Sequence, residues 1–239
     1  MTHRLGKKFA VTQAALKKQV AESVAQAIWD RLEAGMPPIL GVGTGSTVNC
    51  LFEHQELWRR IDAAMPTSQT TEVHLKQLGI ALLRPDQHGE MLPLYVDGAD
   101  EFAPDFALIK GGGGALTQEK RVAARCREFW CLVDASKRVG QLGGFALPVE
   151  VTDAELDAVS QRFLQDLGAE RVAARPHPSE NGHRIIDVQG LAIEHPDALE
   201  VEIESWDGVI CCGLFARNRP QRVFCSGPDG IEILEGPER

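Results

Sequence analysis

The segment ALIKGGGGALTQEK, residues 107–120, brings a lysine, four consecutive glycines and a glutamate together. The apolar run before Lys110 is typical of a short strand, and the residues after the glycines follow a helical pattern. Glycines let a ligand approach the backbone, and successive N–H groups in such a turn can converge on an anion. The N-terminus of the helix adds partial positive charge near Glu119. The segment predicts a ligand-binding loop; the alternative is a tight strand-to-helix connection without function.

A second turn rich in glycine and hydroxyl groups, GVGTGSTV, covers residues 41–48 between a predicted strand and a predicted helix. Backbone amides, hydroxyls and a helix N-terminus together favour phosphate binding. The dinucleotide fingerprint requires a glycine where Ser46 stands, and the lysine of a P-loop is missing. The clustered hydroxyls favour a monophosphate over a pyrophosphate. A turn between a strand and a helix can also be rich in glycine for steric reasons alone.

Three acidic residues, Asp97, Asp100 and Glu101, follow an apolar run over residues 92–96. Carboxylates at the end of a buried strand repel one another and need partners. They could cap a turn, bind a divalent cation or hydrogen-bond sugar hydroxyls, although a cation usually takes more oxygen ligands than this loop offers. Lys110, which we expect one strand later in the same parallel sheet, would supply a counter-charge.

The elements that position these turns alternate between strands and helices. We expect a helix over 13–34, capped by Thr12, in which Lys17 and Lys18 are solvated surface charges. The other predicted elements are strands over 39–43, 61–65, 80–83, 92–96 and 129–133, and helices running through Trp58, over 72–78 and through Cys126. This alternation indicates a parallel sheet covered on both faces, in which ligands bind at the carboxyl ends of the strands. The turns at 44–47, 97–101, 110–114 and 134–137, the last of which contains Lys137, are predicted to meet there.

The pattern changes after Gly143 and Gly144. The predicted elements are a strand over 147–151, a helix over 153–168, strands over 170–175 and 184–189, a helix over 196–203 and a strand over 208–215. This β-α-β-β-α-β order is the split βαβ arrangement. Residues 221–234 are expected to return to the first unit as short strands or a turn. The sequence therefore predicts an α/β protein of two units, 1–144 with 221–239 and 145–220.

Composition narrows the class of protein. The chain has 239 residues, of which 44% are hydrophobic and 25% charged, and a net charge of −9, which disfavours general attraction to nucleic acid or to an anionic membrane. No apolar run approaches the roughly 20 residues of a membrane span. The basic N-terminus lacks the features of a signal peptide, so we expect a cytoplasmic protein. The six cysteines and seven histidines show no metal-binding spacing, and we predict buried free thiols.

Five stretches of the sequence resemble the type A ribose-5-phosphate isomerases. The matching strings are GVGTGSTV (41–48), YVDGADEF (95–102), IKGGGGALTQEKRVA (109–123), LVDASK (132–137) and LPVEV (147–151). They occur in the order and spacing of that family, and the resemblance extends over nearly the whole chain after about residue 14. One departure is Gln118, which stands beside the glutamate where the family more often has arginine.

The resemblance implies an aldose–ketose isomerase that interconverts ribose 5-phosphate and ribulose 5-phosphate in the non-oxidative pentose phosphate pathway, without cofactor or metal. It further implies a Rossmann-like domain (1–144 with 221–239), a ferredoxin-like domain (145–220) and a homodimer. The family's catalytic base falls on Glu119. Its substrate contacts fall on Thr44, Gly45, Ser46, Thr47, Asp97, Gly98, Ala99, Asp100, Lys110, Gly111, Gly112, Gly113 and Lys137.

The expected chemistry needs one carboxylate, which removes a proton from one carbon and returns it to the next through an enediolate. Lys110 and the amides of the glycine run would stabilise the enediolate oxygen, and the turn at 44–47 with Lys137 would hold the phosphate. Asp97 and Asp100 are expected to move hydroxyl protons and to assist ring opening, with the division between them left open. The alternatives are a phosphosugar-binding sensor without turnover and a nucleotide-dependent oxidoreductase, which Ser46 disfavours.

Overall fold

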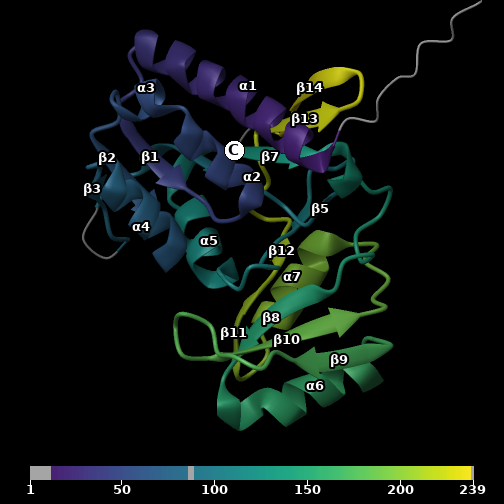
Figure 1. The fold of residues 1–239 in the computed structure, drawn as a ribbon. Coiled ribbons are helices and arrows are strands. Elements are labelled where there is room, and N and C mark those ends of the chain that lie inside the picture. Colours follow the sequence, from purple (N-terminus) through teal and green to yellow (C-terminus); the bar gives the residue numbers. More distant parts are fainter. Residues whose placement is uncertain (1–11, 86–88, 238–239) are drawn as a thin grey trace, which may run out of the picture.

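The computed structural model describes residues 12–85 and 89–237, which form two sheets of different kinds joined by a third, small one. The larger sheet has the strand order β14-β13-β7-β4-β1-β2-β3 (Figure 1). All its pairs are parallel except β13 with β14, which form a C-terminal hairpin at one edge. Its strands are β1 (Ile39–Val42), β2 (Ala63–Pro66), β3 (Ala81–Leu82), β4 (Leu92–Asp97), β7 (Cys126–Asp134), β13 (Arg222–Gly227) and β14 (Gly230–Glu235).

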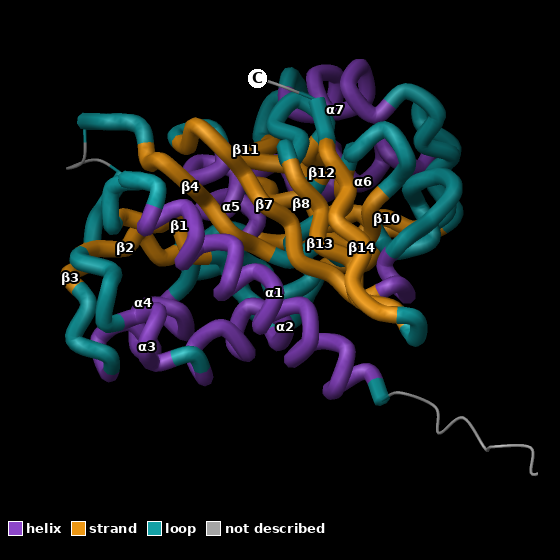
Figure 2. The backbone as a smooth tube through the Cα atoms, turned by 90° about the horizontal axis from the view of Figure 1, so that it is seen from above, coloured by secondary structure: helices purple, strands orange, loops and turns teal. Residues whose placement is uncertain are grey.

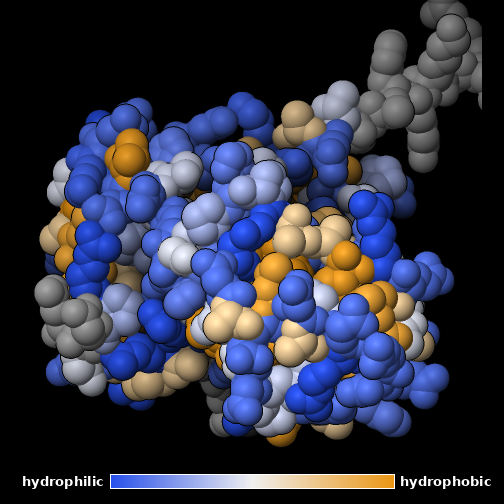
Figure 3. All heavy atoms as spheres, turned by 90° about the horizontal axis from the view of Figure 1, so that it is seen from below, coloured by the Kyte–Doolittle hydropathy of each residue, from blue (hydrophilic) through white to orange (hydrophobic). Residues whose placement is uncertain are grey.

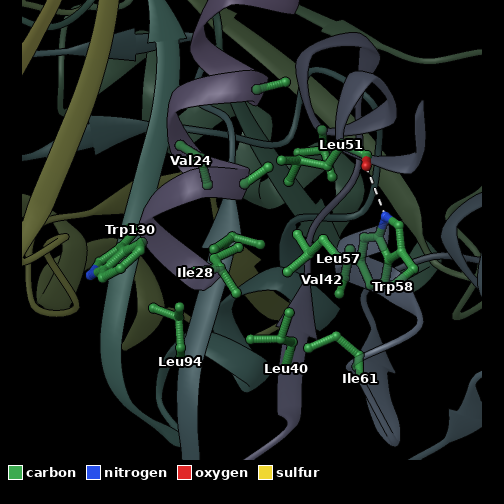
Figure 4. Close-up of a cluster of buried hydrophobic side chains, with 14 of the residues drawn as sticks. Val24, Ile28, Leu40, Val42, Leu51, Leu57, Trp58, Ile61, Leu94 and Trp130 are labelled. Atoms are coloured by element: carbon green, nitrogen blue, oxygen red, sulfur yellow. Dashed lines mark hydrogen bonds between the residues drawn. The ribbon is translucent and has the colours of Figure 1, made fainter. Parts of the chain in front are cut away.

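Helices cover both faces of this sheet, as the view in Figure 2 shows. On one face lie α1 (Gln13–Glu33), α2 (Ser46–Asn49), α3 (Gln55–Trp58) and α4 (Gln69–Gln77), and on the other lies α5 (Leu116–Ala123). Side chains of α1 such as Val24 and Ile28 pack on Leu40 and Leu94 of the sheet, and Figure 4 shows this cluster. The near-continuous burial of β1, β4 and β7 is what a parallel sheet covered on both faces requires.

The smaller sheet is antiparallel, with the strand order β11-β8-β10-β9. Its elements are β8 (Leu147–Val151), a 3₁₀ turn (Asp153–Glu155), α6 (Leu156–Gln165), β9 (Arg171–Ala174), β10 (Arg184–Gln189), α7 (Pro196–Glu204) and β11 (Val209–Cys212). A separate apolar core that includes Phe163 and Trp206 lies between this sheet and its helices. The predicted α/β class with a smaller split βαβ unit is confirmed. The division of the chain at residues 144 and 221 stays a prediction.

One expectation about the larger sheet is wrong. The strand before Lys110, β6 (Leu108–Ile109), lies in a separate antiparallel sheet between β5 (Glu101–Phe102) and β12 (Leu214–Phe215). Only five residues connect β5 to β6, whereas a parallel crossover needs about a dozen or more. Alternate residues of this small sheet face different cores: Ile109 belongs to the core of the smaller unit and Leu108 to that of the larger sheet. The small sheet therefore joins the two units directly before the glycine run.

Some element boundaries also differ from the prediction. The helix expected to run through Trp58 is divided into α2, a 3₁₀ turn (Cys50–Glu53) and α3, because His54 leaves the helical region at ψ 67°. The Trp58 indole N–H instead donates to the Leu51 carbonyl at 2.8 Å, shown as the dashed line in Figure 4. Cys126, expected in a helix, begins β7. The basic N-terminal segment up to residue 11 and part of the loop predicted over 84–91 lie outside the described residues.

None of the helices in the described ranges has the length and apolar character needed to span a membrane. All six cysteines are free thiols, and all but Cys50 are buried.

Candidate active site

The four predicted turns meet around one cavity of about 140 Å³. Three of them follow β1, β4 and β7 at the carboxyl edge of the larger sheet, and the glycine run reaches the same place from β6. Every predicted site residue except Asp97 lines this cavity, together with Lys17 and Val48. The predicted lining residues are Thr44, Gly45, Ser46, Thr47, Gly98, Ala99, Asp100, Lys110, Gly111, Gly112, Gly113, Glu119 and Lys137.

Lys110 is a buried cation between two carboxylates. Its Nζ atom lies 2.8 Å from Oδ2 of Asp97 and 3.3 Å from Oε2 of Glu119, and it donates to the Gly98 carbonyl at 2.5 Å. Its side chain is only 3% exposed. Burial by itself lowers the pKa of Lys110, but the negative charges of Asp97 and Glu119 outweigh it and raise that pKa above its ordinary value. Lys110 is therefore protonated throughout the neutral range and places a fixed positive charge at the cavity.

Glu119 projects from the first turn of α5 into the same cavity. Its Oε2 atom is buried and lacks a hydrogen-bond donor, because the approach of Lys110 has the distance of an ion pair but not the angle of a hydrogen bond. Burial raises the pKa of Glu119 to about 8, an effect that Lys110 opposes and the charge of Asp97 reinforces. A buried carboxylate oxygen without a donor is ready to accept a proton from a ligand in the cavity.

Asp97 and Asp100 differ in what their oxygens contact. Both oxygens of Asp97 are used inside the protein: Oδ1 accepts from the amides of Thr44 and Gly98, and Oδ2 accepts from Lys110 and from the hydroxyl of Tyr95. Asp97 is completely buried. Within the described residues, the half-buried Asp100 accepts only from the amide of Gly112, at 2.8 Å from Oδ2, and it lines the cavity. The third acid, Glu101, turns away and caps the turn at residues 143–145.

The glycines at the site have identifiable steric reasons. A Cβ atom on Gly43 would lie 1.9 Å from Cγ of Asp97, so a side chain there would displace that carboxylate. Gly111 has a φ of 95°, a conformation that L side chains rarely adopt. A Cβ atom on Gly112 would lie 2.7 Å from Oδ1 of Asp100. The backbone must therefore pass close to both carboxylates, which only glycine permits.

The other end of the cavity can hold an anion. The first turn of α2 contributes backbone N–H groups without intrahelical partners, next to the hydroxyls of Ser46 and Thr47. Lys137 lines the same cavity from the turn after β7. Lys17 of α1 donates to Oγ of Ser46 at 2.9 Å. Two ammonium groups beside free amides suit a phosphate dianion despite the negative net charge of the chain.

Sequence reasoning missed two residues of this site. Lys17 was predicted to be an ordinary surface charge, but it lines the cavity and bonds to Ser46. Lys17 and Ser46 are 29 residues apart in the sequence, so no local pattern indicated their contact. Tyr95, the only tyrosine of the chain, is fully buried and donates to Asp97. Its position two residues before Asp97 on the same strand, which puts both side chains on one face, was the available signal.

The hydroxyl-rich turn at residues 67–71 stabilises the site through hydrogen bonds to Gly43 and Thr44. Oγ1 of Thr44 lies 2.9 Å from Oγ1 of Thr67 and 2.8 Å from Oγ of Ser68, and Thr71 donates to the Gly43 carbonyl at 2.7 Å. These hydrogen bonds tie the turn after β1 to the start of α4. A larger hollow of about 690 Å³ lies on the far side of this turn, beside α4, but it lacks the buried charges of the smaller cavity. Within the described ranges, no group of three His, Cys, Asp or Glu side chains is arranged to hold a metal ion.

Comparison with known proteins identifies the family. The family model for ribose 5-phosphate isomerase A (phosphoriboisomerase A) matches residues 63–230. The ribose-5-phosphate isomerase A of Leptothrix cholodnii is 42% identical over 197 residues, which cover 82% of this chain and 89% of that protein.

Two solved structures agree with this match. The crystal structure of ribose 5-phosphate isomerase A from Neisseria gonorrhoeae has a TM-score of 0.87 and 32% identity, covering 96% of this chain and 100% of that one. A D-ribose-5-phosphate isomerase in complex with phospho-erythronic acid has a TM-score of 0.84 and 29% identity, and the match covers 94% of this chain and 99% of that one. The resemblance found in the five sequence motifs is confirmed. This chain belongs to the ribose 5-phosphate isomerase A family.

Proposed function

We propose that this protein interconverts ribose 5-phosphate and ribulose 5-phosphate, with Glu119 as the group that carries the proton between C1 and C2. The observation that carries this assignment is that Glu119 lines the cavity and that its buried Oε2 atom has no hydrogen-bond donor and lies 3.3 Å from a protonated lysine. A base for a carbon-bound proton needs an open oxygen, and the negative charge that then develops needs a cation nearby.

The proposed reaction begins with the open-chain aldose. Glu119 takes the proton from C2, the C–H electron pair becomes the C1–C2 double bond, and the carbonyl oxygen at C1 gains negative charge. Lys110 and the amide of Gly113 stabilise this enediolate. The oxygen at C1 then gains a proton and the hydroxyl at C2 loses one, and Glu119 returns its proton to C1. The product is the ketose, and the carboxylate is regenerated.

The two aspartates are proposed to divide their work. Asp97 holds Lys110 and the turn after β1, because both its oxygens already accept hydrogen bonds from the protein. Asp100 is the candidate for exchanging hydroxyl protons and assisting ring opening, since Oδ1 accepts no hydrogen bond within the described part of the chain and the residue lines the cavity. Thr44 to Thr47, Lys137 and Lys17 would bind the phosphate and thereby place C1 and C2 beside Glu119.

The raised pKa of Glu119 predicts a pH profile. Because the base works as a carboxylate, kcat/KM should fall as the pH falls through the pKa of about 8. Between about pH 9 and pH 7 we expect a decrease of about tenfold. The substrate phosphate, with a second pKa of about 6, is a dianion over this range and does not contribute. Initial rates at low substrate concentration measure the profile, and a flat profile over the range would contradict the assignment of the base.

The position of Lys17 predicts a specific effect on substrate binding. Lys17→Met should raise KM about threefold to tenfold, the value of one charge-assisted hydrogen bond to phosphate, and leave kcat within about twofold. The matched control is Lys18→Met, because Lys18 is the next residue and pairs with Glu53 at 2.8 Å on the surface instead. Equal effects of the two substitutions on KM would remove Lys17 from the phosphate site.

One assay tests the proposed function against its alternatives. The purified protein is given ribose 5-phosphate in EDTA with no nicotinamide cofactor, and formation of ribulose 5-phosphate is followed. We expect turnover, since we propose no metal and no cofactor. Binding of ribose 5-phosphate without turnover would favour the sensor, and turnover only after a metal or nicotinamide is added would overturn the proposed mechanism.

We further propose a cytoplasmic homodimer, with the small-molecule phosphosugar as substrate and neither nucleic acid nor membrane as partner. A self-association surface is supported by exposed apolar side chains of the smaller unit, Val201 on α7 and Ile210 on β11. Figure 3 shows apolar residues gathered in one part of the face seen from below. Such gathered apolar surface favours a protein–protein contact.

A further inference from the structure

Arg175, a side chain of the smaller unit, contacts the glycine run of the candidate active site. This residue directly follows β9, and its Nη1 atom donates to two consecutive carbonyl oxygens of the glycine run, those of Gly111 at 3.1 Å and Gly112 at 3.2 Å. The contact spans more than sixty residues of sequence. None of the chemistry proposed above uses it.

The guanidinium of Arg175 is itself held in place. Asp187 on the neighbouring strand β10 accepts from Nε at 2.8 Å and from Nη2 at 2.7 Å, a two-point pairing that fixes the plane of the group. The amide of Arg175 also donates to the Ile185 carbonyl, which continues the β9–β10 pairing. With Nε and Nη2 engaged by Asp187, Nη1 is directed at the glycine run. The side chains of Arg175 and Asp187 are only 20% and 28% exposed.

Because peptide groups are planar, this contact also fixes the direction of the N–H groups on the opposite side of the glycine run. In a trans peptide the C=O of one residue and the N–H of the next point in opposite directions. With the carbonyls of Gly111 and Gly112 both held by Arg175, the amides of Gly112 and Gly113 must both point away from it. The amide of Gly112 does so by donating to Asp100, and Gly113 lines the cavity.

A run of four glycines would not keep this orientation unaided. Glycine occupies most of the allowed backbone conformations at little cost, so an unrestrained loop would rotate its peptide groups among several orientations. A positive charge on the carbonyl side also polarises each peptide and strengthens its N–H as a donor.

We propose that Arg175, held by Asp187, is a positioning residue that directs the amides of Gly112 and Gly113 toward Asp100 and the enediolate. This inference rests on the proposed isomerase function and adds a contribution from the smaller unit to it. The residue acts through the glycine run and does not touch the substrate. Its loss should therefore affect the stabilisation of the enediolate more than the binding of the phosphate.

The test compares Arg175→Met with the matched control Arg171→Met, since Arg171 begins the same strand β9 and is exposed. We expect kcat to fall about tenfold to a hundredfold in Arg175→Met, less than the loss of a whole oxyanion donor, with KM changed by less than about threefold. Binding is measured with two probes: phospho-erythronic acid, whose carboxylate carries charge at the end opposite its phosphate, and inorganic phosphate. In Arg175→Met the affinity for phospho-erythronic acid should fall about tenfold, and the affinity for inorganic phosphate should be unchanged.

Two results would overturn the proposal: a kcat within about twofold of that of Arg171→Met, or an equal loss of affinity for both probes, which would indicate a general collapse of the site. Asp187→Asn gives a second measurement with a milder change, and it should shift kcat and probe affinity in the same direction as Arg175→Met. An inactive wild-type protein would contradict the proposed function itself, whereas an active wild type with an unaffected Arg175→Met would contradict this inference alone.

Discussion

Glu119→Gln should lower kcat for ribose 5-phosphate by about 10²–10⁴-fold, the usual contribution of a general base, and leave the fold intact. The amide keeps the size of the side chain but cannot accept the proton from C2. Because Lys110 still pairs with Asp97, the buried cation keeps a counter-charge. KM should change little, since the phosphate end of the cavity is untouched. Steady-state rates of ribulose 5-phosphate formation measure the effect.

The same substitution has an expected effect on stability, which serves as its control. Because burial raises the pKa of Glu119 in the folded protein, the carboxylate form destabilises the fold at pH values above the ordinary pKa of the residue. Glu119→Gln removes this penalty, so near pH 8 the variant should unfold at the same temperature as the wild type or higher. Glu22→Gln, an exposed change on α1, should alter neither activity nor melting temperature. Near-normal turnover by Glu119→Gln would refute its role as base.

Much of the candidate site could be predicted because parallel sheets gather sequence-distant turns. Once the alternation of strands and helices is recognised, the turns after β1, β4 and β7 must lie at one edge, whatever separates them in the chain. Local residue types then indicate the chemistry. Hydroxyls beside a helix N-terminus indicate phosphate binding, and the carboxylates after β4 and the glutamate after the glycine run indicate proton transfer. These features depend on neighbours in sequence, which is why they could be identified without coordinates.

The contacts that could not be predicted come from long-range packing. The placement of β6 outside the parallel sheet depends on β12, more than a hundred residues later, and on the two cores that their alternate side chains fill. Lys17 reaches Ser46 because α1 packs against α2, a contact between elements that no local sequence pattern indicates. Arg175 reaches the glycine run because the smaller sheet is placed against it. The hydrophobic periodicity of a helix or strand predicts which of its faces is buried, but it does not predict which other element packs against that face.

Phe215 on β12 is an example of long-range packing that places charged side chains. Two ammonium groups lie over its ring, that of Lys110 at 5.5 Å from the centroid and that of Lys120 at 5.1 Å. Lys120 follows Glu119 on α5 but turns to the smaller unit, where it pairs with Glu200 at 2.7 Å and Glu204 at 2.6 Å of α7. Lys110 and Lys120 thus each lie between two carboxylates and over the same ring, but the side chain of Lys120 is partly exposed, and of the two only Lys110 lines the cavity.

This pair makes a sharp test of Lys110 possible. Lys110→Met should lower kcat by about 10²–10³-fold, the cost of losing one group that stabilises an oxyanion. It should also move the rise of kcat/KM to higher pH, because Lys110 opposes the increase in the pKa of Glu119 that burial causes. Stability should fall as well, by about 3–5 kcal/mol, since Asp97 is left as a buried charge without its cation. Rates, pH profiles and chemical unfolding measure the three effects.

Lys120→Met should lose a similar amount of stability, because it leaves the buried carboxylate of Glu200 without its cation, but its kcat should fall less than about tenfold and its pH profile should stay in place. A common loss of stability with a divergent loss of activity would separate the chemistry at Lys110 from the general cost of removing a buried ion pair. If the two variants lost activity equally and kept the same pH profile, Lys110 would be a structural cation only. The charge that stabilises the enediolate would then have to come from the glycine amides alone.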